Sequence, residues 1–87
     1  MQNKEIVTAL KKAGTHLNNV IKMVDDGKYC IDILQQNLAV IGLLKSANSK
    51  LMKRHLNSCF ARAMQGTDEK RKQEMIEEIL AINKLNR

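Results

Sequence analysis

The sequence predicts an all-α protein whose protomer has three helices, a very long second helix, and an antiparallel bundle formed with other copies. The chain contains no proline, only four glycines and only 2% aromatic residues. Leu, Lys, Ala, Gln and Glu are abundant and favour helix over sheet. With 87 residues, the chain is expected to form one domain over residues 1–87.

The first helix is predicted over about Asn3–Val24. Its apolar residues recur at steps of three and four, which places them on one helical face; they are Ile6, Leu10, Ala13, Leu17, Val20, Ile21 and Val24. Asn3 is expected to cap its start. The helix is expected to stop at Asp25-Asp26-Gly27, because Gly27 can adopt the left-handed cap conformation.

The second helix is predicted from Lys28 to about Gln65, because this stretch contains no proline and only one glycine, Gly42. A helix of roughly 36 residues would be about 54 Å long at about 1.5 Å per residue. A globule of this size is only about 25–30 Å across. The central residues Leu38–Leu44 are apolar on nearly every face, and such a helix must be buried all round. We therefore expect long antiparallel helices from two or more subunits to cover one another.

The third helix is predicted after Gly66. Thr67 is its expected N-cap, and Asp68 and Glu69 then lie at the positive end of the helix dipole. Its apolar side is marked by Met75, Ile76, Ile79, Leu80 and Ile82.

The charge and the cysteine count limit the class of protein. The net charge of +6 favours a polyanionic partner such as nucleic acid, although a basic protein without such a partner fits equally well. The polar opening, Met1–Glu5, predicts no signal peptide, and no apolar stretch approaches the length of a membrane span. We therefore expect a cytoplasmic protein, in which two cysteines indicate metal binding or redox chemistry rather than a structural disulfide.

An enzyme is not expected, and neither is a small-molecule substrate. The sequence offers no set of nucleophile, base and orienting residue, no glycine-rich phosphate loop and no evident carboxylate dyad. His16 is a lone histidine on a helix and is interpreted as structural.

The residues Cys30, His55 and Cys59 form the candidate metal site. His55 and Cys59 are four residues apart, so on a helix they share a face with Cβ atoms about 6 Å apart. Cys30 lies on the same predicted helix, about 37 Å before His55 at about 1.5 Å per residue. An antiparallel partner helix would bring its own Cys30 to this pair, so the predicted site lies between subunits.

The three candidate ligands form a soft donor set. Thiolates select Cu(I), Zn(II) and related ions. Because Zn(II) usually takes four ligands, three donors favour Cu(I). A single buried cysteine or a surface histidine is usually structural, and His-x-x-x-Cys alone is a weak signal. The three residues together favour the metal site.

The sequence resembles the copper-sensitive operon repressor family over nearly its whole length. The resemblance is carried by His16-Leu17, by Lys28-Tyr29-Cys30-Ile31-Asp32-Ile33-Leu34-Gln35-Gln36, by Arg54-His55-Leu56-Asn57-Ser58-Cys59-Phe60 and by Glu77-Glu78. It implies three-helix protomers that form homodimers and then a homotetramer. It also implies repression of a metal-resistance operon by the metal-free protein and release of operator DNA on metal binding.

The resemblance also implies roles for individual residues. Its Cys, His, Cys ligand pattern is that of the Cu(I)-binding members, since nickel, cobalt and formaldehyde members have His in place of Cys59 and persulfide-sensing members lack His55. Tyr29 and Glu78 are implied as partners of the ligands, and Glu78 as the link between His55 and the third helix. An ordinary core tyrosine and a solvated glutamate remain the alternatives.

DNA contacts are implied by the resemblance, with departures. Family members usually carry Arg where this chain has Ala9, and often basic or glycine residues at the positions of Gly14 and Thr15. A second basic position in the long helix is Ser46 or Ser49 in this chain. The cations that remain for phosphate contacts are Lys4, Lys11, Lys12, Lys50, Lys53 and Arg54. A solvated polar face explains these cations equally well.

Three functions therefore stay open at this point. The first is a Cu(I)-responsive repressor. The second is a copper-binding or buffering protein that has lost operator recognition, which Ala9 and the two serines suggest. The third is a thiol or persulfide sensor in which Cys30 and Cys59 of neighbouring subunits become bridged.

Overall fold

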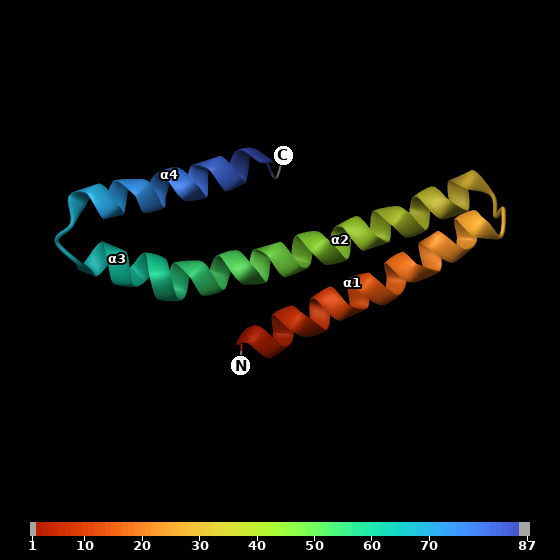
Figure 1. Ribbon diagram of the computed structural model, residues 1–87, viewed down its shortest axis with the longest axis horizontal. Helices are drawn as coiled ribbons and strands as arrows, with labels where there is room; N and C mark the ends of the chain where they lie inside the picture. Colours follow the sequence, from red (N-terminus) through yellow and green to blue (C-terminus); the bar gives the residue numbers. More distant parts are fainter. Residues whose placement is uncertain (1, 86–87) are drawn as a thin grey trace. The chain divides into compact units, whose positions relative to one another are not determined.

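The computed structural model describes residues 2–85, which contain helices and turns and no strand (Figure 1). The elements are α1 (Gln2–Asp25), α2 (Cys30–His55), the π-helical turn η1 (Leu56–Phe60), α3 (Ala61–Gln65) and α4 (Glu69–Leu85). α2, η1 and α3 follow one another without a non-helical residue. The all-α fold with three helical segments and a very long second one is confirmed.

The chain forms two compact units, Met1–Met52 and Lys53–Arg87. That residues 1–87 act as one domain stays a prediction. None of the helices in residues 2–85 combines the length and the apolar character that a membrane crossing requires.

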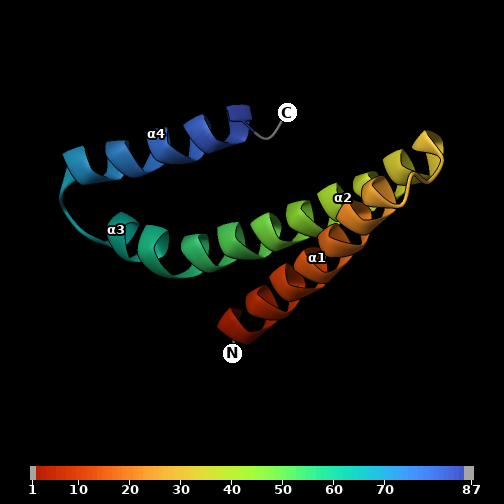
Figure 2. The same cartoon turned by 45° about the vertical axis from the view of Figure 1, so that its right-hand side comes forward.

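In the first unit, α1 lies antiparallel beside α2 (Figures 1 and 2). The buried and half-buried residues of α1 recur at steps of three and four, as on the seam of a coiled coil; they are Ile6, Ala9, Ala13, His16, Val20 and Met23. The corresponding residues of α2 include Ile33, Val40, Leu43, Ala47 and Lys50. His16 Nε2 and Gln36 Oε1 form a hydrogen bond of 2.8 Å between the two helices.

A second apolar row on α1 is exposed and is not covered by α2 within the described part of the first unit. We call it the uncovered row; its residues are Val7, Leu10, Leu17, Ile21 and Val24, each between 43% and 57% exposed. On α2, Leu34, Leu38, Ile41 and Leu44 are exposed as well. The apolar face predicted for α1 is therefore two adjacent rows, of which one packs on α2 and the other meets solvent.

The end of α1 is the predicted one. The helix ends at Asp25, and Gly27 has a φ of 68°, in the left-handed region. The amide of Lys28 donates to the carbonyl of Met23 at 3.0 Å, and that of Gly27 donates to Val24 at 3.1 Å, as in a Schellman motif. The start differs from the prediction, because α1 already includes Gln2 and Asn3 lies within its first turn.

In the second unit, α3 and α4 lie side by side and are joined by residues 66–68 (Figure 1). Met75, on the predicted apolar side of α4, is 1% exposed, whereas Ile76, Leu80 and Ile82 remain exposed. The prediction that Thr67 is the N-cap of α4 is wrong. Asp68 caps α4 instead, because its Oδ1 accepts the amide of Arg71 at 3.1 Å.

Candidate metal centre

His55 and Cys59 are both in the second unit, at the junction of α2 and η1. His55 is the last residue of α2 and is half-buried; no hydrogen bond to its ring is found within residues 2–85. Cys59 is a free, exposed cysteine in η1. The prediction assumed a regular α-helical turn between these residues, whereas they are joined by a π turn, which holds more residues per turn. The His55 imidazole and the Cys59 thiol remain one helical turn apart, and both can still act as metal donors.

Cys30 and Tyr29 lie at the start of α2, in the first unit. Cys30 is a free, exposed cysteine, and the side chain of Tyr29 is exposed. α2 is unbroken from Cys30 to His55, which was the premise for expecting the third ligand from a second copy. Within residues 2–85 of one chain, no three His, Cys, Asp or Glu side chains are grouped so that they could hold a metal ion.

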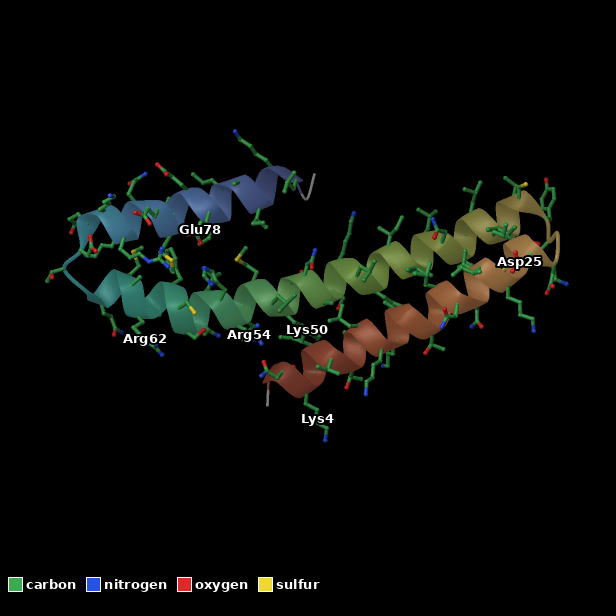
Figure 3. The ribbon with its side chains drawn as sticks, viewed as in Figure 1. Lys4, Asp25, Lys50, Arg54, Arg62 and Glu78 are labelled. Carbon is green, nitrogen blue, oxygen red and sulfur yellow. The ribbon has the colours of Figure 1, made fainter. Side chains whose placement is uncertain are left out.

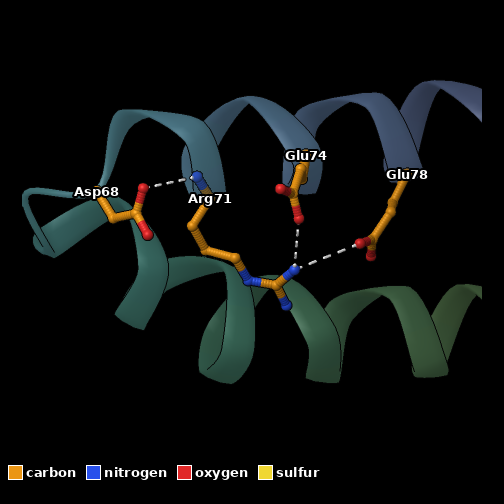
Figure 4. Close-up of polar contacts among 4 residues, drawn as sticks. All are labelled: Asp68, Arg71, Glu74 and Glu78. Carbon is orange, nitrogen blue, oxygen red and sulfur yellow. Dashed lines mark hydrogen bonds and ion pairs between the residues drawn. The ribbon is translucent and has the colours of Figure 1, made fainter.

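Glu78 lies on α4, where it contacts Arg71 (Figure 4). Arg71 Nη1 is 3.7 Å from Glu78 Oε1 and 3.4 Å from Glu74 Oε2, and all three side chains are about half exposed. This arginine was not predicted as part of the site. The signal for it is the spacing of three and seven residues to Glu74 and Glu78, which places all three side chains on one side of the helix.

Three of the candidate DNA-binding lysines line one groove in the first unit. We call it the basic groove; it measures about 560 Å³ and is lined by Lys4, Glu5, Thr8, Ala9, Lys12, Leu43, Ser46 and Lys50. Figure 3 shows Lys4 on α1 and Lys50 on α2, and both residues line this groove. Lys50 Nζ donates to Ser46 Oγ at 3.0 Å.

The other candidate cations lie elsewhere. Lys11 lines a neighbouring hollow of about 470 Å³ together with Lys12 and His16. Lys53 and Arg54 belong to the second unit. Ala9, where the resemblance implied an arginine, lines the basic groove, and so does Ser46, one of the two positions (Ser46 or Ser49) at which it implied a second basic residue.

The chain matches the family described as metal-sensitive transcriptional repressor over residues 2–84. It is 33% identical to the copper-sensing transcriptional repressor CsoR of Mycobacterium ulcerans (strain Agy99) over 63 residues, which are 72% of this chain and 54% of that protein. It is 29% identical to CsoR of Bacillus subtilis (strain 168) over 83 residues, or 95% of this chain and 79% of that one.

A solved structure is similar as well. The crystal structure of the copper-sensing repressor CsoR with Cu(I) from Geobacillus thermodenitrificans NG80-2 superimposes with a TM-score of 0.81 at 33% sequence identity. The match covers 94% of this chain and 82% of that one. The chain spans about half the length of the mycobacterial CsoR proteins that it matches.

Proposed function

Because this chain belongs to the family of metal-sensitive transcriptional repressors, we propose that it binds operator DNA without metal and releases it when Cu(I) binds. The relatives named above are copper-sensing repressors, and one of them was crystallised with Cu(I). Such a regulator is not an enzyme, and it acts where the DNA is, in the cytoplasm.

The observation that carries the copper assignment is the donor set. Cys30 and Cys59 are free thiols, and His55 has an imidazole with no hydrogen-bond partner in residues 2–85. As thiolates, the two sulfurs are soft ligands that prefer Cu(I), and an imidazole completes a three-donor set. Bound Cu(I) would supply a positive centre that holds the three side chains together. Zn(II) would usually require a fourth protein ligand or a water.

The proposed site joins two protomers. Since α2 is unbroken between Cys30 and His55, we infer that Cys30 of one protomer meets His55 and Cys59 of its partner. The uncovered row of α1 and the exposed Leu38 and Ile41 of α2 give the first unit a large apolar surface, which a second copy would bury. We expect an antiparallel dimer with a four-helix bundle, and a tetramer built from two dimers.

The link from metal to DNA is proposed to run through Glu78 and Tyr29. A histidine that binds metal through one ring nitrogen usually donates its other N–H to an oxygen acceptor. A carboxylate oxygen of Glu78 would accept the hydrogen bond that this N–H of His55 donates, and the Tyr29 hydroxyl would support the ligand set. In this proposal Glu78 exchanges its contact with Arg71 for one with His55, so that α4 changes its contacts and the DNA-binding shape loses population.

The DNA surface is proposed to be centred on the basic groove. Lys4, Lys12 and Lys50 line it, and Lys11, Lys53 and Arg54 are the further candidate contacts. Lysines bind phosphate without reading bases, so they contribute affinity and salt dependence rather than sequence preference.

The first prediction tests this function directly. Metal-free protein selects duplexes from a random-sequence pool, and the affinity for the selected sequence is then measured by fluorescence anisotropy under anaerobic conditions, with and without Cu(I). One equivalent of Cu(I) per protomer should lower the affinity roughly 10- to 100-fold, a usual range for allosteric coupling. Cys30→Ala should keep the metal-free affinity and lose the response.

Two outcomes favour other functions. Tight Cu(I) binding with no selected sequence would favour a copper-buffering protein, which Ala9 and Ser46 in the basic groove motivate. DNA release by a persulfide that survives in His55→Ala would favour the thiol sensor.

A further inference from the structure

The basic groove has one acidic residue, Glu5, among the described residues that line it. Lys4, Lys12 and Lys50 bring positive charge to the groove, whereas Glu5, in the first turn of α1, brings negative charge. The Glu5 side chain is exposed, and within residues 3–85 its carboxylate has no hydrogen-bond or ion-pair partner. A carboxylate repels phosphate, so Glu5 does not add to the general attraction of this groove for DNA.

The two hydroxyl groups of the groove are engaged within the protein. Thr8 Oγ1 donates to the carbonyl of Lys4 at 2.8 Å, and Ser46 Oγ accepts a hydrogen bond from Lys50 Nζ at 3.0 Å. The groove is otherwise lined by apolar side chains, those of Ala9 and Leu43. Among the side chains that line the groove, the carboxylate of Glu5 is therefore the strong acceptor that has no partner within residues 3–85.

A DNA duplex offers different partners to lysine and to glutamate. Phosphate oxygens accept hydrogen bonds from lysine at any sequence, so lysines that hold phosphate give affinity without sequence preference. A carboxylate can only accept hydrogen bonds, so on DNA its partners are the amino groups of the bases.

The base amino groups that suit a carboxylate belong to G·C pairs. Cytosine presents its N4 amino group in the major groove, and guanine presents its N2 amino group in the minor groove. The N6 amino group of adenine lies beside the acceptor N7, with which a carboxylate cannot form a hydrogen bond. A glutamate that reaches the base edges is therefore expected to select a G·C pair, whichever groove of the DNA it enters.

We propose that Glu5 determines sequence preference in the basic groove: while the lysines hold phosphates, its carboxylate accepts a hydrogen bond from the amino group of a G·C pair. This inference rests on the proposed function. The three lysines outnumber the single glutamate, so the groove keeps a net positive charge and remains attractive to DNA.

Glu5 also lies where an acidic residue stabilises a helix, because its charge faces the positive end of the helix dipole. That effect belongs to the free protein and is the same for every DNA sequence. It predicts a change in unfolding when Glu5 is replaced, but no change in the preferred bases. The preferred bases are therefore the measurement that separates a reading role from a purely structural one.

The test compares the DNA sites chosen by full-length, metal-free wild-type protein and Glu5→Gln. Each protein selects duplexes from a random-sequence pool, and fluorescence anisotropy then measures its affinity for both selected sites. Glutamine keeps the length of the side chain, and its amide both donates and accepts, as the N6 and N7 atoms of adenine require. At least one G·C pair of the wild-type site should become A·T, and each protein should prefer its own site by roughly 10-fold.

Two further variants serve as controls. Glu5→Asp keeps the carboxylate on a shorter side chain, so it should bind more weakly and still select G·C. Glu69→Gln removes the same charge from the first turn of α4, at an exposed position outside the groove. It should select the wild-type site, with any gain in affinity shared by all duplexes.

The outcomes separate the two levels of inference. If Glu5→Gln selects the wild-type site and differs from the wild type only by a gain for every duplex, as Glu69→Gln does, the reading role of Glu5 is overturned and the proposed function stands. If the wild-type protein selects no sequence at all, the proposed function fails, and the role of Glu5 fails with it.

Discussion

Ala9 is a half-buried residue of α1 whose methyl group lines the basic groove. Lys4, Lys12 and Lys50 surround the same groove, so a longer cation at position 9 would join an existing positive surface. An arginine there could bind one phosphate with two parallel hydrogen bonds, which a lysine cannot do. The small residue at position 9 thus limits how strongly this groove can hold DNA.

Ala9→Arg is therefore expected to strengthen DNA binding severalfold at moderate salt. The plot of log affinity against log salt should become steeper by about one unit, because one more phosphate is neutralised. Fluorescence anisotropy titrations over a range of salt concentrations measure both effects. Asn83→Arg, which adds the same charge to exposed α4, is the control. An equal gain in both variants would mean that only the total charge matters.

Arg71 is the interaction partner of Glu78, and the sequence alone did not identify it. Family resemblance pointed to Glu78, but Glu78 could have faced solvent or any of several cations on its own helix. The partner depends on side-chain rotamers, which a sequence does not specify. An exposed ion pair of this kind contributes no more than about 1 kcal/mol. Glu78 can therefore change partner at small cost, as the proposed link to His55 requires.

The elements were predicted well where apolar spacing and backbone chemistry agreed. The absence of proline, together with a single glycine in the stretch, predicted the long second helix, and Gly27 predicted the end of α1. η1 was not predicted, because a π turn adds one residue to a turn without altering composition or leaving a breaker in the sequence.

The cap of α4 gives a prediction at this scale. Thr67 and Asp68 are both good N-cap residues, and only the structure distinguishes them. Asp68→Ala should lower the free energy of unfolding by about 1 kcal/mol, since the amide of Arg71 loses its acceptor. Thr67→Ala should change it by less than about 0.5 kcal/mol. Urea unfolding of the metal-free variants at one fixed protein concentration measures both; effects of equal size would contradict the assignment of the cap.

At the scale of the whole molecule, the candidate ligands are predicted to divide between subunits. Apolar composition at the centre of α2 predicted association, but no feature of the sequence fixes how many copies assemble. The exposed apolar side chains of the first unit agree with the need for a partner. The ligand set Cys30, His55 and Cys59 and its completion by a second copy stay predictions that a mixing experiment can decide.

Mixing Cys30→Ala with Cys59→Ala provides that test. Neither variant alone has a complete site. In a mixed dimer, an intact Cys30 from one protomer meets an intact His55 and Cys59 from the other. Random pairing makes about half of the dimers mixed, with one complete site instead of two. Anaerobic Cu(I) titration after joint refolding should therefore recover about a quarter of the wild-type high-affinity capacity.

The matched control mixes Cys59→Ala with His55→Ala. Both defects then lie on the same side of the proposed site, so no pairing of these protomers completes it. Recovery of capacity in this control, or its absence in the first mixture, would argue against ligands shared between subunits.

The uncovered row of α1 lies one residue round the helix from the row that packs on α2, so protomer folding and the proposed pairing would use neighbouring strips of one helix. Pairing that covers this row adds stability by mass action, and dilution removes it. Each tenfold drop in concentration costs the assembly about 1.4 kcal/mol. Scarcity in the cell would then weaken the regulator itself, since fewer copies form fewer pairs and fewer pairs hold fewer complete sites.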